Sequence, residues 1–123
     1  MKKSFSWKDR IKSFKPALNG LKFAISNEYN FRVQLIAAML TIAVSAALNL
    51  SLIEWSIIIM CIGMVTGAEI FNSAIEHLVD LVSPEFQEAA GKVKDLAAGA
   101  VFILAFTALI IAIILLGSKL YQF

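Results

Sequence analysis

Residues 69–80 read Glu-Ile-Phe-Asn-Ser-Ala-Ile-Glu-His-Leu-Val-Asp and close an apolar run that begins at Trp55. Four polar side chains recur in this stretch at offsets of 0, 3, 7 and 11, namely Glu69, Asn72, Glu76 and Asp80. An α-helix turns by ~100° per residue, so seven or eleven steps return to within ~20° of the start, and three steps fall ~60° away. The spacing therefore predicts one helix that carries all four side chains on one broad stripe, which we call the polar seam.

Two further apolar stretches accompany this helix. Residues 33–50 and 96–116 contain 18 and 21 residues without a charge. Hydrophobic residues make up 59% of the whole chain, against ~45–50% in soluble domains. Helices of this length span the hydrocarbon of a bilayer, in which backbone groups must pair internally. We therefore predict an all-α membrane protein, a single domain over residues 1–123, with spans at about 33–50, 55–82 and 95–116.

The positive charges gather on one side of these spans. Lys92 and Lys94 lie in the link between the second and third spans, and only Lys119 follows the third. The others all precede the first span: Lys2, Lys3, Lys8, Arg10, Lys12, Lys15, Lys22 and Arg32. Because Lys and Arg flank membrane helices on the cytoplasmic side, we expect the N-terminus and the second link to face the cytoplasm.

The segment before the first span has a helical pattern of its own. Over residues 5–30, apolar side chains recur mostly at intervals of three and four, while lysines largely occupy other faces: Phe5, Ile11, Phe14, Leu18, Leu21 and Ile25. This pattern predicts an amphipathic helix on the anionic inner membrane surface, with Pro16 as its candidate point of division. The simpler alternative is a basic tail that only sets topology. The segment has no apolar core before a small-residue cleavage site, so we expect no cleaved signal peptide.

The polar seam also predicts chemistry. An intramembrane carboxylate costs ~2.5–3.5 kcal/mol on insertion scales, so Glu69 and Glu76 need a reason to be there. Asn72 alone could hydrogen-bond between helices, but two carboxylates favour a cation, a proton or both. Magnesium is usually held by one or two carboxylates plus substrate phosphates. Glu28 and Lys94-Asp95 come from two other segments and reach the same membrane depth, which favours an active site.

Three segments carry a family resemblance. The stretch from Glu69 to Asp80 is very similar to the signature of the prokaryotic diacylglycerol kinase and undecaprenol kinase family. The run from Ala90 to Ala100 resembles the same family, as does Asn27-Glu28 followed by Phe31-Arg32. The resemblance implies a multi-pass enzyme of the prokaryotic cell membrane. It further implies a homotrimer whose active sites are shared between subunits at the cytoplasmic interface, with ATP as phosphoryl donor and Mg²⁺ as cofactor.

The resemblance also implies residue roles. Glu69 is expected to be the general base, and Glu28 and Glu76 the magnesium ligands. The residues expected to contact the nucleotide are Glu28, Asn72, Glu76, Glu85, Phe86, Gln87, Lys94 and Asp95. Asp9 stands where relatives carry an arginine, and Arg10 follows it, so the arginine's role is not transferred. His77 is interpreted as an interfacial residue because it lies ~100° around the helix from Glu76.

The predicted reaction is phosphorylation of a membrane lipid alcohol, with diacylglycerol converted to phosphatidic acid as the first expectation. Undecaprenol is the alternative acceptor, because both lipids are long alkyl alcohols. A small cation- or proton-coupled transporter is the alternative of another class, since an intramembrane glutamate is typical of such transporters. The charges gather at one leaflet, however, and a transporter needs polar groups past the midplane. A non-catalytic assembly subunit leaves the convergence of three charged segments unexplained.

Overall fold

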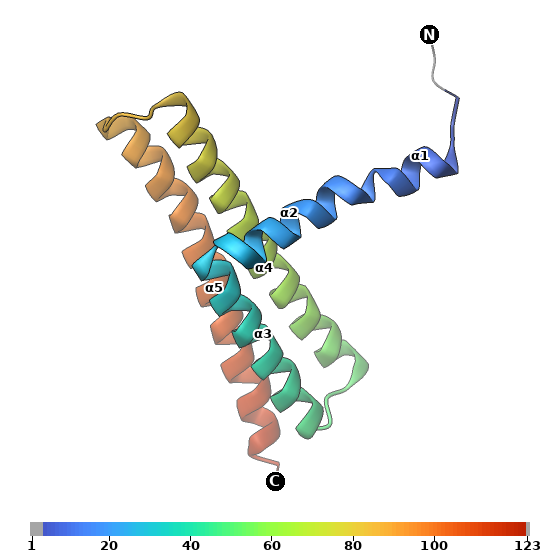
Figure 1. Cartoon of the computed structure of the whole chain (residues 1–123). Helices are drawn as coiled ribbons and strands as arrows, with labels where there is room; N and C mark the ends of the chain where they lie inside the picture. The colour runs from blue at the N-terminus through green and yellow to red at the C-terminus, as the bar shows by residue number, and fades with distance from the viewer. Residues whose placement is uncertain (1–3, 123) are drawn as a thin grey trace.

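The computed structural model describes residues 4–122, so Lys2 and Lys3 of the positively charged N-terminal segment lie outside the described residues. Every regular element in this range is an α-helix, which confirms the all-α prediction (Figure 1). The helices are α1 (Trp7–Lys12), α2 (Phe14–Asn27), α3 (Tyr29–Ala47), α4 (Leu52–Val82) and α5 (Glu88–Leu120).

The three predicted spans correspond to α3, α4 and α5, each long and apolar enough to cross a membrane. At ~1.5 Å per residue, the 31 residues of α4 extend ~46 Å, well beyond the ~30 Å of a hydrocarbon core. The predicted third span begins at residue 95, but α5 already begins at Glu88. The first turns of α5 carry charged residues and can form outside the lipid. The ends of α4 and α5 therefore project beyond the apolar layer.

Helices α4 and α5 form a long antiparallel pair, and α3 lies along the part of it that is farther from the 83–87 link (Figure 1). The α3–α4 turn is stabilised by a capping box: the Ser51 backbone N–H donates to Glu54 Oε2 at 2.7 Å, and the Glu54 N–H donates to Ser51 Oγ at 3.2 Å. Asn49 adopts a left-handed backbone conformation with φ 51°, which asparagine tolerates better than most residues. This turn sets α3 antiparallel to α4.

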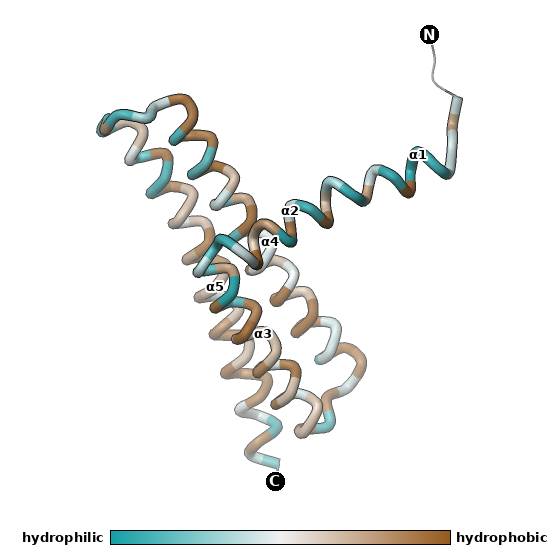
Figure 2. The backbone as a smooth tube through the Cα atoms, viewed as in Figure 1, coloured by the Kyte–Doolittle hydropathy of each residue, from teal (hydrophilic) through white to brown (hydrophobic). Residues whose placement is uncertain are grey.

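The surface segment divides at Ser13 rather than at Pro16. The Ser13 backbone N–H donates to the carbonyl oxygens of Asp9 and Arg10, both at 3.2 Å, and ends α1. Pro16 then lies in the first turn of α2, where a missing N–H removes no intrahelical bond. Hydrophilic and hydrophobic residues alternate along α1 and α2, whereas α3, α4 and α5 are mostly hydrophobic along their length (Figure 2).

Few side chains are buried within the single chain. The buried hydrophobic residues are Ala24, Phe31, Leu48 and Ile58, and the buried polar ones are Ser45, Glu69, Asn72 and Ser73. Large apolar side chains are exposed on all three spans, as expected where they contact lipid tails or a further protein chain. Two members of the polar seam are therefore among the best-buried residues of the chain.

Candidate active site

Glu69 lies at the deep end of the polar seam. This residue is only 4% exposed, and its Oε2 accepts a hydrogen bond of 3.1 Å from Nε2 of Gln34 on α3. The carboxylates of Glu76 and Glu28 both lie close enough to interact with it electrostatically. The Gln34 amide thus holds one oxygen of this buried carboxylate, the Asn72 amide also lies close enough to interact with it, and two other negative groups stand nearby.

The next turn of α4 adds an amide and a second carboxylate. Asn72 Nδ2 donates to Glu76 Oε1 at 3.3 Å. Two amide oxygens, Asn72 Oδ1 and Gln34 Oε1, are buried without a hydrogen-bond partner among the described residues. Buried acceptors normally find a donor, so the site is short of donors and suits a ligand that brings a cation or a hydroxyl proton.

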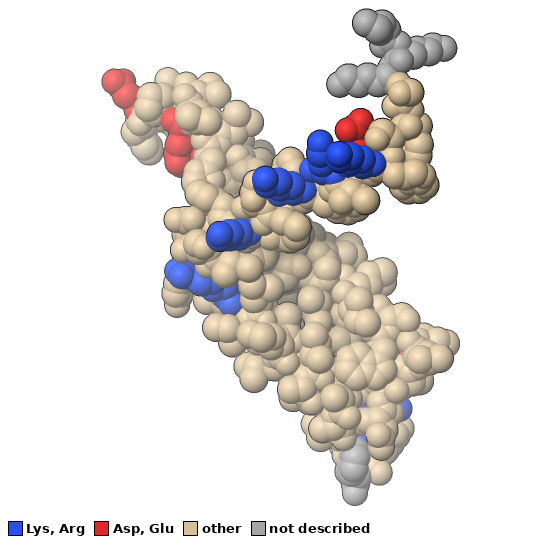
Figure 3. All heavy atoms as spheres, turned by 45° about the vertical axis from the view of Figure 1, so that its right-hand side comes forward, with Lys and Arg blue, Asp and Glu red and all other residues tan. Residues whose placement is uncertain are grey.

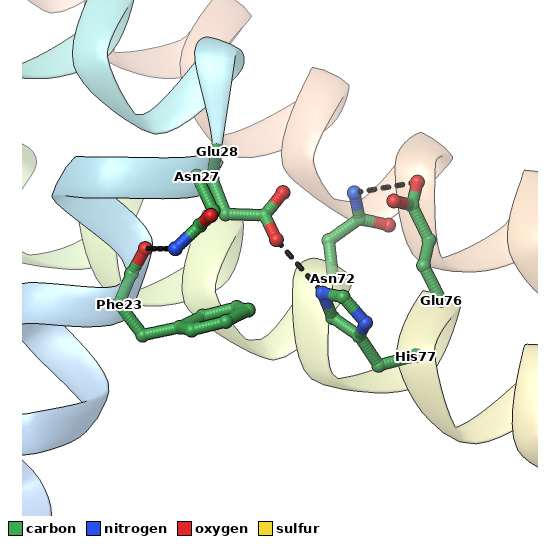
Figure 4. Close-up of polar contacts among 6 residues, drawn as sticks. All are labelled: Phe23, Asn27, Glu28, Asn72, Glu76 and His77. Atoms are coloured by element: carbon green, nitrogen blue, oxygen red, sulfur yellow. Dashed lines mark hydrogen bonds and ion pairs between the residues drawn. The ribbon is translucent and has the colours of Figure 1, made fainter.

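The α2–α3 junction supplies the third carboxylate. Glu28 separates the two helices with an extended backbone (φ −103°, ψ 105°), and its Oε1 lies 2.8 Å from Nε2 of His77. Figure 4 shows Glu28 and His77 pointing toward each other, with the Asn72–Glu76 hydrogen bond on the same part of α4. The fold therefore brings Glu28, Glu69, Asn72 and Glu76 together, as the sequence predicted.

Asp80 does not join this group. It lies ~6 Å beyond Glu76 along α4, is exposed, and accepts a hydrogen bond of 2.6 Å from Lys94 Nζ on α5. Asp95 is ~100° around α5 from Lys94 and lines a separate open recess with Lys92 and Leu96. The polar seam therefore divides: Glu69, Asn72 and Glu76 lie together, whereas Asp80 pairs with α5.

The remaining predicted nucleotide contacts lie apart from the seam. Glu85, Phe86 and Gln87 form the link at the tip of the α4–α5 pair, where Phe86 is 96% exposed. That tip is ~24 Å along the helix axis from Glu69. Arg10 lies on α1 with its guanidinium over the Phe5 ring at 5.5 Å, and α1 points away from the helical bundle (Figure 1).

Comparison with known proteins decides the family. Residues 15–116 match the family model described as prokaryotic diacylglycerol kinase. The chain belongs to this family. It is 38% identical over 110 residues to the undecaprenol kinase of Bacillus subtilis (strain 168), covering 89% of each chain. It is 35% identical over 108 residues to the diacylglycerol kinase of Escherichia coli (strain K12), covering 88% of each chain.

This membership confirms the resemblance carried by the seam and identifies the protein as a lipid kinase, a transferase. A third relative, the diacylglycerol kinase of Haemophilus influenzae, is 37% identical over 93 residues, covering 76% of this chain and 79% of its own. A kinase takes its phosphoryl group from a nucleotide donor, and its three membrane-compatible helices make this one a membrane protein.

The side chains present in the kinase fit a divalent cation that a nucleotide brings with it. Within residues 4–122, no group of three or more His, Cys, Asp or Glu side chains forms a metal site by itself. Magnesium rarely needs one, because it combines one or two carboxylates with phosphate oxygens and water. Glu28 and Glu76 would provide the carboxylates. The unpartnered Asn72 Oδ1 lies on the same part of α4 as Glu76 (Figure 4), and no described Lys or Arg neutralises either carboxylate. The donor set is hard, anionic and incomplete.

Sequence reasoning missed two contacts of this site. In the sequence, Gln34 is only a polar residue within an apolar run, although the cost of burying an amide in lipid is itself a signal. His77 was interpreted as interfacial, and the ~100° between it and Glu76 gave no reason to pair it with Glu28. Both partners are far away in sequence, at separations of 35 and 49 residues, so local periodicity could not reveal them.

Proposed function

We propose that this kinase transfers the γ-phosphoryl group of Mg·ATP to the hydroxyl of a membrane lipid alcohol at the cytoplasmic surface. The expected acceptor is diacylglycerol, which gives phosphatidic acid, and undecaprenol is the alternative. The observation that carries the proposal is the buried Glu69, held by Gln34 and close to two further carboxylates. The relatives are named for either lipid at similar identity, so they do not decide between the acceptors.

Glu69 is the general base of this proposal. Its carboxylate accepts the proton of the lipid hydroxyl, whose oxygen forms a bond to the γ-phosphorus as the bond from that phosphorus to the leaving ADP oxygen breaks. Gln34 occupies Oε2, which leaves Oε1 for the substrate. A mostly apolar recess of about 240 Å³ begins at Gln34 and runs between α3, α4 and α5 toward Ala112, and its lining suits an alkyl chain.

Glu28 and Glu76 would hold the magnesium ion, which when bound offsets negative charge on the nucleotide phosphates. Asn72 keeps Glu76 oriented through its 3.3 Å hydrogen bond. Lys94 would exchange Asp80 for the nucleotide phosphates, since both offer anionic oxygen to an ammonium group. Asp95 and residues 85–87 complete the nucleotide site.

A homotrimer with shared sites explains why part of that set lies elsewhere. Asp95 faces a different recess from the seam, and residues 85–87 lie at the tip of the helix pair. A neighbouring chain can bring such groups to a site that a single chain leaves incomplete. Gly63 and Gly67 form a G-x-x-x-G pair on α4, a motif that permits close helix packing, and a Cβ atom added at either glycine would meet no other side chain or helix within 4 Å. The space beside this pair is therefore open to a helix of another chain.

The charge distribution supports a cytoplasmic active site. Lys and Arg side chains gather along α1, α2 and the start of α3 (Figure 3). At the opposite end, Lys119 forms an ion pair of 3.1 Å with Glu54. Its charge is therefore neutralised locally, and the positive excess that sets topology lies on the side of the seam. We place this side and the N-terminus in the cytoplasm of a prokaryotic cell.

The test is transfer of radiolabelled γ-phosphate from Mg·ATP by purified protein, with diacylglycerol and undecaprenol offered in separate micelles. Label in one lipid names the acceptor, and Glu69→Gln should abolish transfer while the protein still inserts and binds nucleotide. Glu54→Gln is the matched control, because it makes the same change at a partly buried glutamate at the far end of α4. Near-normal transfer by Glu69→Gln would refute the assignment of the base. No label in either lipid, together with counter-ion flux in proteoliposomes, would favour the transporter.

A further inference from the structure

His77 follows Glu76 on α4 but contacts a different part of the chain. Its Nε2 lies 2.8 Å from Oε1 of Glu28, and because an ionised carboxylate only accepts hydrogen bonds, Nε2 is the donor. Among residues 4–122, this is the only hydrogen bond or ion pair between side chains that joins the α2–α3 junction to α4. The orientation of one proposed magnesium ligand thus depends on a residue that sequence analysis gave no role.

The backbone at Glu28 leaves its side chain free for this contact. Glu28 ends α2 and precedes α3, and its backbone N–H donates to Ala24 O at 2.9 Å while its carbonyl accepts from Arg32 N at 3.2 Å. Its side chain makes no capping hydrogen bond to α3, in keeping with the preference of N-caps for shorter polar residues. Neither helix that flanks Glu28 therefore fixes its carboxylate, and His77 does.

The imidazole itself is held by the surface helix. The Phe23 ring packs against it with its centroid 5.6 Å away at 68°, an edge-to-face arrangement that aromatic pairs favour. Asn27 Nδ2 donates to Phe23 O at 3.0 Å in the last turn of α2. The His77 side chain is 57% exposed but that of Glu28 only 19%. Figure 4 shows the resulting chain of contacts from Phe23 through His77 to Glu28.

We propose that His77 is a positioning residue that holds the carboxylate of Glu28 beside Glu76, so that both can bind the divalent cation of the nucleotide. It occupies Oε1 of Glu28 and leaves Oε2 for the cation. This inference rests on the proposed function, because it needs Glu28 to be a ligand. Partners that orient metal-binding side chains commonly contribute 10–100-fold to metal affinity, so the effect is measurable. The competing explanation is that the pair only ties α4 to the surface helix.

The test uses two variants that differ in one property. His77→Phe keeps a ring against Phe23 and loses the donor, whereas His77→Gln keeps a neutral N–H donor. Binding of Mn²⁺, with a non-hydrolysable ATP analogue present, is followed by electron paramagnetic resonance, and the half-saturating Mg²⁺ concentration is measured in turnover. His77→Phe should lower the affinity for Mn²⁺ and raise the half-saturating Mg²⁺ concentration, each by about 10-fold, without changing the KM for lipid. His77→Gln should keep both values near those of the wild type. Ser26→Ala is the matched control, because Ser26 is exposed two residues before Glu28 and should behave as wild type.

Repeating the measurements in a Glu28→Gln background separates the possible failures. If His77 acts through Glu28, His77→Phe should have no further effect on Mn²⁺ binding there. An equal loss in both backgrounds, or wild-type Mn²⁺ binding by His77→Phe, would overturn the proposal while leaving Glu28 as a ligand. Wild-type Mn²⁺ binding by Glu28→Gln itself would refute the ligand role and this inference with it. His77→Ala, which cannot clash at so exposed a position, gives the same comparison if the Phe variant inserts poorly.

Discussion

Replacing Gln34 tests whether the base needs a partner on another helix. Gln34→Met keeps the length of the side chain but removes the 3.1 Å hydrogen bond to Glu69 Oε2. A hydrogen bond to a charged group contributes about 1.5–3 kcal/mol, and each 1.36 kcal/mol corresponds to tenfold in rate. If the bond acts fully in orienting the base, kcat should fall about 10- to 150-fold, because a freely rotating carboxylate is poorly aligned with the substrate hydroxyl.

The assay is initial-rate phosphoryl transfer over a range of lipid and ATP concentrations. Thr41→Val is the control: Thr41 lies seven residues along α3 in the same recess, and its hydroxyl donates only to Ala37 O of its own helix at 2.8 Å. The control should keep its kcat, and neither variant should change the KM for ATP. Wild-type kcat in Gln34→Met would refute the orienting role, and a raised KM for lipid with unchanged kcat would show that Gln34 binds the lipid instead.

Four further variants examine the rest of the site and its surroundings. Glu76→Gln should raise the half-saturating Mg²⁺ concentration at least about tenfold, since it removes a proposed ligand; an unchanged Mg²⁺ titration would exclude that role. Lys94→Met should raise the KM for ATP about tenfold or more, as loss of a charged hydrogen bond predicts. Asp80→Asn should leave the KM for ATP unchanged or lower it, because Lys94 loses its competing partner. Lys119→Met should lower the melting temperature in detergent by breaking the ion pair with Glu54 but leave kcat unchanged, and a large loss of activity would contradict the placement of the site at the other end.

The sequence predicted what depends on local periodicity. Three spans follow from uncharged apolar runs, and the stripe through Glu69, Asn72 and Glu76 follows from helix geometry alone. The break at Ser13 was misplaced at Pro16 because proline is compatible with a first helical turn, so its presence only bounds where a helix begins. The early start of α5 at Glu88 was missed because hydropathy reports the apolar layer, whereas the helix continues into water.

The contacts that set side-chain orientation could not be read in the same way. Gln34 to Glu69 and His77 to Glu28 each join distant segments, and their pairing depends on how α3 and the surface helix pack against α4. Asp80 illustrates the converse. Its angle on the helix matches that of Glu69, but it lies beyond Glu28 and Glu76 and meets α5 instead, so it pairs with Lys94. Angle predicts the face of a helix, and depth decides the partner.

Depth also separates the kinase from the transporter. Glu69 is buried, and Glu76 lies ~10 Å closer to the end of α4 that meets the 83–87 link. On the other side of Glu69, the residues of α4 back to Glu54 carry no charge, and the hydroxyl of Thr66 is already bonded to Ile62 O at 2.7 Å. A carrier of ions or protons needs polar groups that continue past the midplane, and this helix stops providing them at Glu69. A lipid kinase needs the opposite arrangement: a base deep enough to meet an alcohol held in the membrane, and cation ligands shallow enough to meet a nucleotide from water.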